Sequence, residues 1–269
     1  MKQKVALVLS SGGARGIAHI GAIRELLSQG YEITSISGSS MGALIGGVYA
    51  AGKLDEYEEW LCSLDKIDVF KLIDFTLSKS GIIKAQKVLD EMKMFIPDRN
   101  IEDLPVKYNA ITTDLTEHSE VVLSKGSLYN AIRASISIPA VFTPIQTDNS
   151  VFIDGGVLNP IPTNRVIRED GDILIAVNVN AYTPKNEGPK PIRNWSYYDV
   201  VGGTVGLMLS QIAKLTLKIN PPDVLVEISR DAYEIYDFYK AHELIELGKN
   251  NTRKELVKYT RQVNSLHSI

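Results

Sequence analysis

The sequence has little that would suit a secreted, nucleic-acid-binding or membrane-spanning protein. Cys62 is the single cysteine in 269 residues, so no disulfide can form within the chain and a reducing compartment is expected. Lysine and arginine total 29 against 32 aspartates and glutamates, and the net charge of −3 leaves no electrostatic footprint for nucleic acid. No uninterrupted run of about 18 apolar residues occurs, so no membrane-spanning helix is expected.

Other absences concern the N-terminus and the organisation of the chain. The apolar run at residues 5–9 is shorter than the apolar segment of a signal peptide, so we interpret it as a buried strand of an unsecreted protein. Internal repeats, low-complexity segments and clusters of metal-ligating residues are all lacking. The composition, 44% hydrophobic and 23% charged, is that of an ordinary globular protein, and 269 residues are enough for one large α/β domain or two small ones.

The order of the first elements predicts a parallel sheet. The first fifty residues alternate as strand, glycine loop, helix, strand, sharp turn and helix, which is typical of right-handed crossovers. Further strands are expected at residues 107–112, 120–123, 151–153, 173–179 and 224–228. Residues 55–64 and 85–95 are expected to be helical and to form a cap over the site, and the proline-rich stretch 183–193 a loop.

Two amphipathic or charged segments follow the predicted sheet. An apolar stripe at alternating spacings of four and three runs from Val201 to Ile219, and packing of this helix against the sheet is expected. A membrane-facing role for the stripe is the alternative. The run 239–259 is helical and richly charged, and is expected to form a solvated outer layer.

The segment "GSSMG" carries a Gly-x-Ser-x-Gly pattern centred on Ser40. A serine on a tight turn between a strand and a helix projects out of the sheet, and the flanking glycines permit the turn and the close packing. The dipole of the helix beginning near Met41 would favour an oxyanion beside the serine. Because glycine and serine are common in loops, the pattern alone is also compatible with a plain strand-to-helix connection.

The segment "SSGGARG" (residues 10–16) directly follows the first predicted strand. Backbone N–H groups of small residues at a helix N-terminus form an anion hole, for a phosphate or for the oxyanion of a tetrahedral intermediate. A dinucleotide fingerprint is poorly supported, because Ser11 stands where its first glycine would be. Arg15 is a candidate ligand for a substrate phosphate, with a structural salt bridge as the alternative.

None of the four histidines is well placed to act as the base. His19 lies within the first predicted helix, His118 in a turn, and His242 and His267 in the C-terminal helical tail. Asp154, in "IDGG", follows a predicted buried strand and precedes two glycines, so its carboxylate can reach a neighbouring loop. An ordinary Asp-Gly turn is the alternative interpretation of this motif.

Taken together, the "SGGARG" loop, the "GSSMG" turn, the "SISIPAVFTP" segment and "IDGG" resemble the patatin-like phospholipases over most of the chain. The resemblance implies a three-layer α/β/α fold with a mostly parallel sheet, in one acyl hydrolase domain over residues 1–269 with a candidate cap at about 53–105. It implies a dyad of Ser40 as nucleophile and Asp154 as base. It also implies an oxyanion hole formed by Gly12, Gly13 and Ala14. Ser11 departs from the family's longer glycine run.

The resemblance further implies a cytoplasmic enzyme that cleaves carboxylic esters of lipids or phospholipids through an acyl-enzyme, without a cofactor or metal. Its partners would be the lipid or ester substrate and, peripherally, the inner face of the membrane. Two alternatives stay open: an acyltransferase using the same dyad, and a non-catalytic protein that binds an anionic lipid. Because the base would be a carboxylate, activity is expected to persist further into acid than with an imidazole. The sequence leaves the oligomeric state open.

Overall fold

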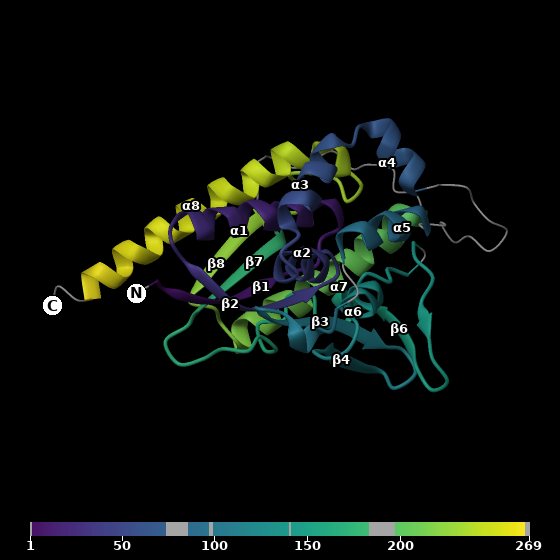
Figure 1. Cartoon of the computed structure of the whole chain (residues 1–269), viewed down its shortest axis with the longest axis horizontal. Coiled ribbons are helices and arrows are strands. Elements are labelled where there is room, and N and C mark those ends of the chain that lie inside the picture. The colour runs from purple at the N-terminus through teal and green to yellow at the C-terminus, as the bar shows by residue number, and fades with distance from the viewer. Residues whose placement is uncertain (1, 74–85, 97–98, 140, 183–196, 267–269) are drawn as a thin grey trace.

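The computed structural model describes residues 2–73, 86–96, 99–139, 141–182 and 197–266 (Figure 1). The predicted loop at 183–193 lies outside these residues. An eight-stranded sheet forms the centre, in the order β5-β6-β3-β2-β1-β7-β8, with β4 paired to β3. Its strands are β1 (Lys4–Leu9), β2 (Glu32–Ser39), β3 (Lys107–Asp114), β4 (Ser119–Leu123), β5 (Ile145–Gln146), β6 (Val151–Asp154), β7 (Ile173–Ala181) and β8 (Val224–Ser229).

The direction of the strands confirms the predicted, mostly parallel sheet. β3, β2, β1, β7 and β8 run parallel, whereas β4 and β6 each pair antiparallel with β3. Every predicted strand is present, and the two-residue β5 is the one described strand that was not predicted. All residues of the run 5–9 are buried, because β1 lies in the middle of the sheet with helices over both faces.

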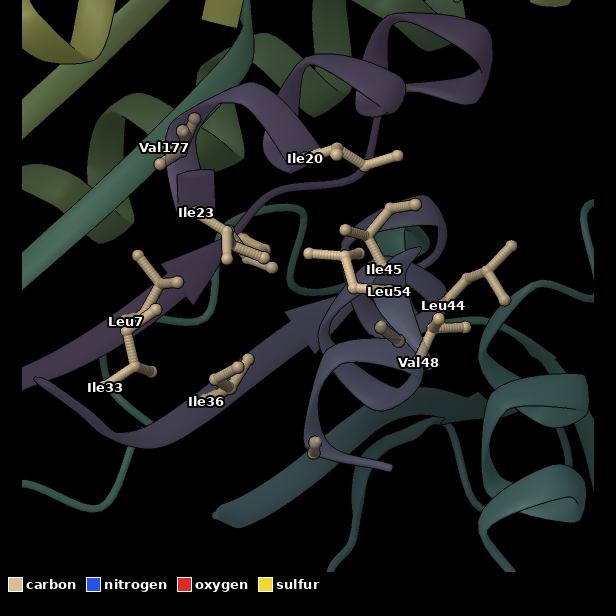
Figure 2. Close-up of a cluster of buried hydrophobic side chains, with 14 of the residues drawn as sticks. Leu7, Ile20, Ile23, Ile33, Ile36, Leu44, Ile45, Val48, Leu54 and Val177 are labelled. Carbon is tan, nitrogen blue, oxygen red and sulfur yellow. The ribbon is translucent and has the colours of Figure 1, made fainter. Parts of the chain in front are cut away.

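One face of the sheet is covered by α1 (Ala18–Ser28), α2 (Met41–Ala50) and α8 (Ala241–Leu266). Figure 2 shows Leu7 of β1 and Ile36 of β2 on this face, with Ile23 of α1 and Val48 of α2 in the same cluster. These side chains are fully or almost fully buried. Burying a leucine or isoleucine contributes roughly 1.5–3 kcal/mol, so this cluster holds the site's two loops on a rigid base.

The prediction that the C-terminal helix is only a solvated layer is wrong. α8 packs closely against α1, because a Cβ on Gly21 would lie 1.8 Å from the carbonyl oxygen of Ile245. Leu244 and Leu256 are fully buried, and Arg253 forms two hydrogen bonds of 2.9 Å with the buried Glu25. Because the outer face of α8 is densely charged, the composition of this segment does not reveal its apolar inner face.

The opposite face of the sheet carries α7 (Tyr197–Ile219), which completes the predicted three layers. Ala213 and Leu217 of α7 pack on Ala6 and Val8 of β1. The predicted packing of the apolar stripe on the sheet is wrong, however. Of its residues, Val201, Val205, Met208, Leu215 and Ile219 are 45% to 74% exposed. The edge of the helix that meets the sheet instead carries Ala213 and Leu217.

The same helix corrects the expectation that no segment is long and apolar enough to cross a membrane. Residues Val200–Ile219 meet that test by length and composition, with a mean hydropathy of 1.4, and only 6% of the window is buried. The segment contains no unbroken run of about 18 apolar residues, because polar residues such as Thr204, Ser210 and Gln211 and two lysines interrupt it.

The helices α3 (Leu54–Ser63), α4 (Lys66–Ile73) and α5 (Gln86–Phe95) come between β2 and β3 in the chain. The predictions of α3 and α5 are confirmed, whereas α4 and α6 (Leu128–Ser135) were not predicted. Tyr57 and Trp60 of α3 contact Phe95 of α5, edge-to-face and tilted respectively, with ring centroids 5.5 and 5.3 Å apart. This aromatic cluster joins the two helices of the predicted cap.

Candidate active site

Ser40 occupies a strained turn between β2 and α2. Its φ and ψ are 54° and −121°, a conformation that non-glycine residues rarely adopt. A Cβ on Gly42 would lie 2.1 Å from the carbonyl oxygen of Leu9, so only glycine permits this approach. The backbone N–H of Ser40 donates to the Oγ of buried Ser135 at 2.9 Å, which holds the turn in place.

The other serines of this segment have different environments. Ser39 is fully buried and does not line the cavity described below. The Oγ of Ser37 donates to Oδ1 of Asn109 at 2.5 Å, below the turn. Ser40 is therefore the serine of this segment that reaches both the cavity and a carboxylate.

Asp154 meets Ser40 at the end of β6. The Oγ of Ser40 donates to Oδ2 of Asp154 at 2.5 Å, and the N–H of Gly156 donates to Oδ1 at 2.7 Å. The register explains the contact: Ile111 of β3 pairs with Ser39, and Thr112 pairs with Asp154. Since β6 runs antiparallel to β3, its carboxyl end arrives beside the nucleophile from the opposite direction.

The burial of Asp154 changes the expected pH behaviour. Loss of solvent raises its pKa from 3.8 to about 6, and the hydrogen bonds from Ser40 and Gly156 only partly oppose this rise. The expectation of activity far into acid assumed an ordinary carboxylate. With a pKa of about 6, Asp154 protonates close to the pH at which a histidine would, so the acid limb of a rate profile does not distinguish the two bases.

The glycine loop after β1 begins a short 3-10 turn at Gly13–Ile17 rather than a full α-helix. Gly13 has a φ of +56°, which favours glycine, and both Gly12 and Gly13 line the cavity beside Ser40. Ala14, in contrast, donates its N–H to the carbonyl of Ile235 at 3.0 Å and does not line the cavity. The N–H of Ala14 is thus already bonded to a distant loop, which favours Gly12 and Gly13 as the donors beside the cavity.

Arg15 and Ser11 border the same loop. Arg15 donates from Nε to Gly12 O at 3.3 Å and from Nη1 to Arg230 O at 2.7 Å, and burial lowers its pKa to about 10. Within the described ranges no ion pair to a carboxylate is found for it, so two carbonyl contacts stand where a structural salt bridge was the alternative. Ser11 donates its N–H to Pro160 O at 2.8 Å and lines the cavity.

A cavity of about 820 Å³ opens from the Ser40–Asp154 pair. Its walls are predominantly apolar and come from both faces of the sheet and from the predicted cap. The apolar lining includes Leu44 of α2, Trp60 and Leu61 of α3, Leu72 of α4, Met92 of α5, Phe142, and Val205 and Ile212 of α7. Such a volume suits a ligand with a long apolar part and one polar, reactive group.

The described histidines lie away from this cavity. The fully buried His19 contacts Ser10 O through Nε2 at 2.8 Å, and burial lowers its pKa to about 4. His118 has a positive φ of 51° in an exposed turn, and neither it nor His242 lines the cavity. His267 is outside the described residues.

We therefore expect each of the substitutions His19→Gln, His118→Gln, His242→Gln and His267→Gln to leave kcat within about tenfold, since removal of a general base costs about 10²–10⁴. Turnover of a short-chain nitrophenyl ester measures this. Thermal unfolding of each variant is the control, because His19→Gln can disturb the glycine loop through Ser10. A variant with native stability and a thousandfold lower kcat would restore a histidine base.

Sequence reasoning missed several residues that shape the site. Ser135 at the end of α6 holds the backbone of Ser40, and the carbonyl of Ser137 accepts the N–H of Asp154 at 2.9 Å. The carbonyls of Ile235 and Arg230 fix the glycine loop from the chain after β8. The "SIS" at the start of segment 135–144 could have pointed to Ser135 and Ser137. No local sequence pattern indicates the contacts made by Arg230 and Ile235.

Comparison with known proteins identifies the family of the chain. Residues 7–167 match the family model of the patatin-like phospholipases. The chain belongs to the patatin-like phospholipase family. An uncharacterised NTE family protein of Mycobacterium tuberculosis is 46% identical over 177 residues, which are 66% of this chain and 49% of that protein. The chain thus spans about half the length of this relative.

Two further likenesses extend over nearly all of the chain. Lysophospholipase NTE1 of Kluyveromyces lactis is 26% identical over 272 residues, covering 91% of this chain and 19% of that protein. The crystal structure of VipD from Legionella pneumophila aligns with a TM-score of 0.51 at 14% identity, over 96% of this chain and 67% of that one. The second likeness supports the patatin-like fold.

In the parts of the chain that the structure describes, no group of three or more His, Cys, Asp or Glu side chains is placed to hold a metal ion.

Proposed function

We propose that the protein hydrolyses carboxylic esters of lipids or phospholipids, with Ser40 as nucleophile and Asp154 as general base. The observation that carries the proposal is the 2.5 Å hydrogen bond between these two buried side chains, at the end of a large apolar cavity. Membership of the patatin-like phospholipase family and the likeness to a lysophospholipase point to the same reaction class.

The first half of the reaction acylates the enzyme. Asp154 Oδ2 takes the proton of Ser40 Oγ as that oxygen attacks the ester carbonyl, forming a C–O bond and placing a negative charge on the carbonyl oxygen. The N–H groups of Gly12 and Gly13, together with the N-terminus of α2, stabilise this charge. Asp154 then gives the proton to the leaving alcohol as the original ester bond breaks.

The second half releases the fatty acid. Water loses a proton to Asp154 and attacks the acyl carbonyl, and the bond to Ser40 Oγ breaks as that oxygen regains the proton. The raised pKa of Asp154, about 6, makes it a stronger base than an ordinary carboxylate, while at neutral pH it is still ionised. The apolar cavity would hold the acyl chain, and it keeps bulk water from the pair.

We further propose that residues 1–269 form one domain in which α3, α4 and α5, within residues 53–105, act as a cap. Side chains of all three helices line the cavity, including Trp60, Val69 and Met92. A cap of this kind would select substrates by the length and shape of the acyl chain. The cytoplasmic location stays a prediction.

A serine-reactive fluorophosphonate tests the function. We expect it to label Ser40 in the folded protein, as located by peptide mapping, because the probe needs an activated hydroxyl beside an oxyanion hole. Ser39→Ala is the matched control and should be labelled like the unmodified protein. Failure to label folded protein, or persistent labelling of Ser40→Ala, would count against the assignment and favour a non-catalytic lipid-binding protein.

A further inference from the structure

The side of α7 that faces away from the sheet is unusually apolar for a helix at the surface. Seven large apolar side chains are exposed on it: Val200, Val201, Val205, Leu207, Met208, Leu215 and Ile219. Soluble monomers rarely expose so many contiguous apolar groups without a partner. In Figure 1 the helix runs diagonally across the molecule.

The apolar surface is continuous with the cavity. Val201, Val205 and Met208 line the cavity, whereas Leu215 and Ile219 extend the same stripe beyond it towards the C-terminal end of the helix. A lipid that enters past the first three side chains would pass directly from an apolar surface into the acyl cavity. The stripe therefore extends the apolar surface from the cavity to the outside of the protein.

The charges on the helix favour a particular partner. Between Val200 and Ile219 the sequence has Lys214 and Lys218, both exposed, and no acidic residue, although the chain as a whole has a net charge of −3. Apolar residues combined with lysines are typical of helices that lie in the interface of an anionic membrane. A second copy of α7 placed on this stripe would offer the two lysines no carboxylate between Val200 and Ile219.

We propose that α7 is the membrane-docking surface of the enzyme and lies flat in the interface of an anionic phospholipid membrane, so that lipid enters the cavity directly. This inference rests on the proposed function, because it assigns the source of the substrate. α7 connects β7 to β8, which are adjacent parallel strands, and its Ala213 and Leu217 stay packed on the sheet. Both ends of the helix are thereby tied to the same domain, which suits a surface position better than a membrane span.

Vesicle flotation tests the docking, with the full chain carrying Ser40→Ala so that the lipid is not consumed. Vesicles of equal parts phosphatidylcholine and phosphatidylglycerol should bind the protein, and pure phosphatidylcholine vesicles should bind it less. Leu215→Glu with Ile219→Glu should weaken binding about tenfold or more, because both side chains lose their apolar contact with lipid. Neither residue lines the cavity.

A second variant and a control keep the test specific. Lys214→Gln with Lys218→Gln should weaken binding to the anionic vesicles about fivefold per lysine and reduce its sensitivity to salt. Val257→Glu is the matched control, because Val257 is an exposed apolar residue of α8, and it should bind like the parent. With Ser40 restored, all these variants should hydrolyse a soluble short-chain ester at the native rate, which also shows that they fold.

The outcomes separate docking from catalysis. Unchanged vesicle binding by both α7 variants would overturn the docking even if fluorophosphonate labels Ser40. A dimer that dissociates on Leu215→Glu with Ile219→Glu, while vesicle binding stays the same, would also overturn it and make a second copy the partner. Loss of vesicle binding by both α7 variants, together with no fluorophosphonate labelling of the protein that retains Ser40, would support the docking and contradict the hydrolase.

Discussion

Asp154→Asn should lower kcat for a short-chain nitrophenyl ester by about 10²–10⁴, the usual cost of removing a general base. The substitution preserves the shape of the site. A carboxamide oxygen can still accept the N–H of Gly156, and the amide can donate to the Oγ of Ser40. What it removes is the group that takes the proton of the serine.

The control for this experiment is Asp148→Asn, in the exposed turn between β5 and β6. It makes the same chemical change close by in the sequence and should keep the native rate. Steady-state kinetics on both variants, with circular dichroism to check the fold, separates the role of Asp154 from a general effect of charge. Near-native turnover by Asp154→Asn would refute the dyad and require another base.

The second large effect is a pH dependence of the free energy of unfolding, to which Asp154 and His19 should contribute with opposite signs. The pKa of His19 is about 4 in the folded protein against 6.5 for the ordinary side chain, because it is buried. Between these values the unfolded chain binds a proton that the folded protein does not, so the free energy of unfolding falls as the pH is lowered. The slope is about 1.4 kcal/mol per pH unit.

For Asp154 the sign is reversed. Its folded pKa of about 6 lies above the ordinary 3.8, so between these values the folded protein holds a proton that the unfolded chain has lost. Its contribution to the free energy of unfolding therefore rises as the pH is lowered from 6 to 4, and is lost as the pH rises through 6. In the unmodified protein the contributions of the two residues largely cancel over this range.

Single substitutions should expose each slope. Relative to the unmodified protein, Asp154→Asn should lose on the order of 3 kcal/mol of stability between pH 6 and 4, and His19→Gln should gain a similar amount. Urea unfolding at several pH values measures both, and the other titrating groups cancel in the comparison. The double variant should run parallel to the unmodified protein, and identical slopes in all four proteins would contradict the assigned pKa shifts.

Local sequence was sufficient for the sheet and for the two loops of the site. Strands such as β1 and β7 contain continuous apolar runs, at residues 5–9 and 173–177, because both of their faces are buried, and no distant contact is needed to recognise them. The turns at Gly42 and Gly13 could also be predicted from the sequence, because a turn with a close backbone approach or a positive φ admits few residues other than glycine. Ser40 and Asp154 stood beside such glycines in the sequence.

The tertiary structure decided which groups remain free to act and at what pH. The N–H of Ala14 is occupied by Ile235, 221 positions later in the chain, and nothing in the glycine loop itself reveals this. The pKa of Asp154 depends on the burial of the whole pocket, and only the antiparallel pairing of β6 brings the carboxylate to Ser40. The apolar stripe of α7 was read correctly as a pattern, yet its direction depends on which edge of the helix the sheet accepts. Periodicity shows that a helix has an apolar face, whereas the packing of the other edge, with Ala213 and Leu217, on the sheet decides that this face meets the surroundings and not the core.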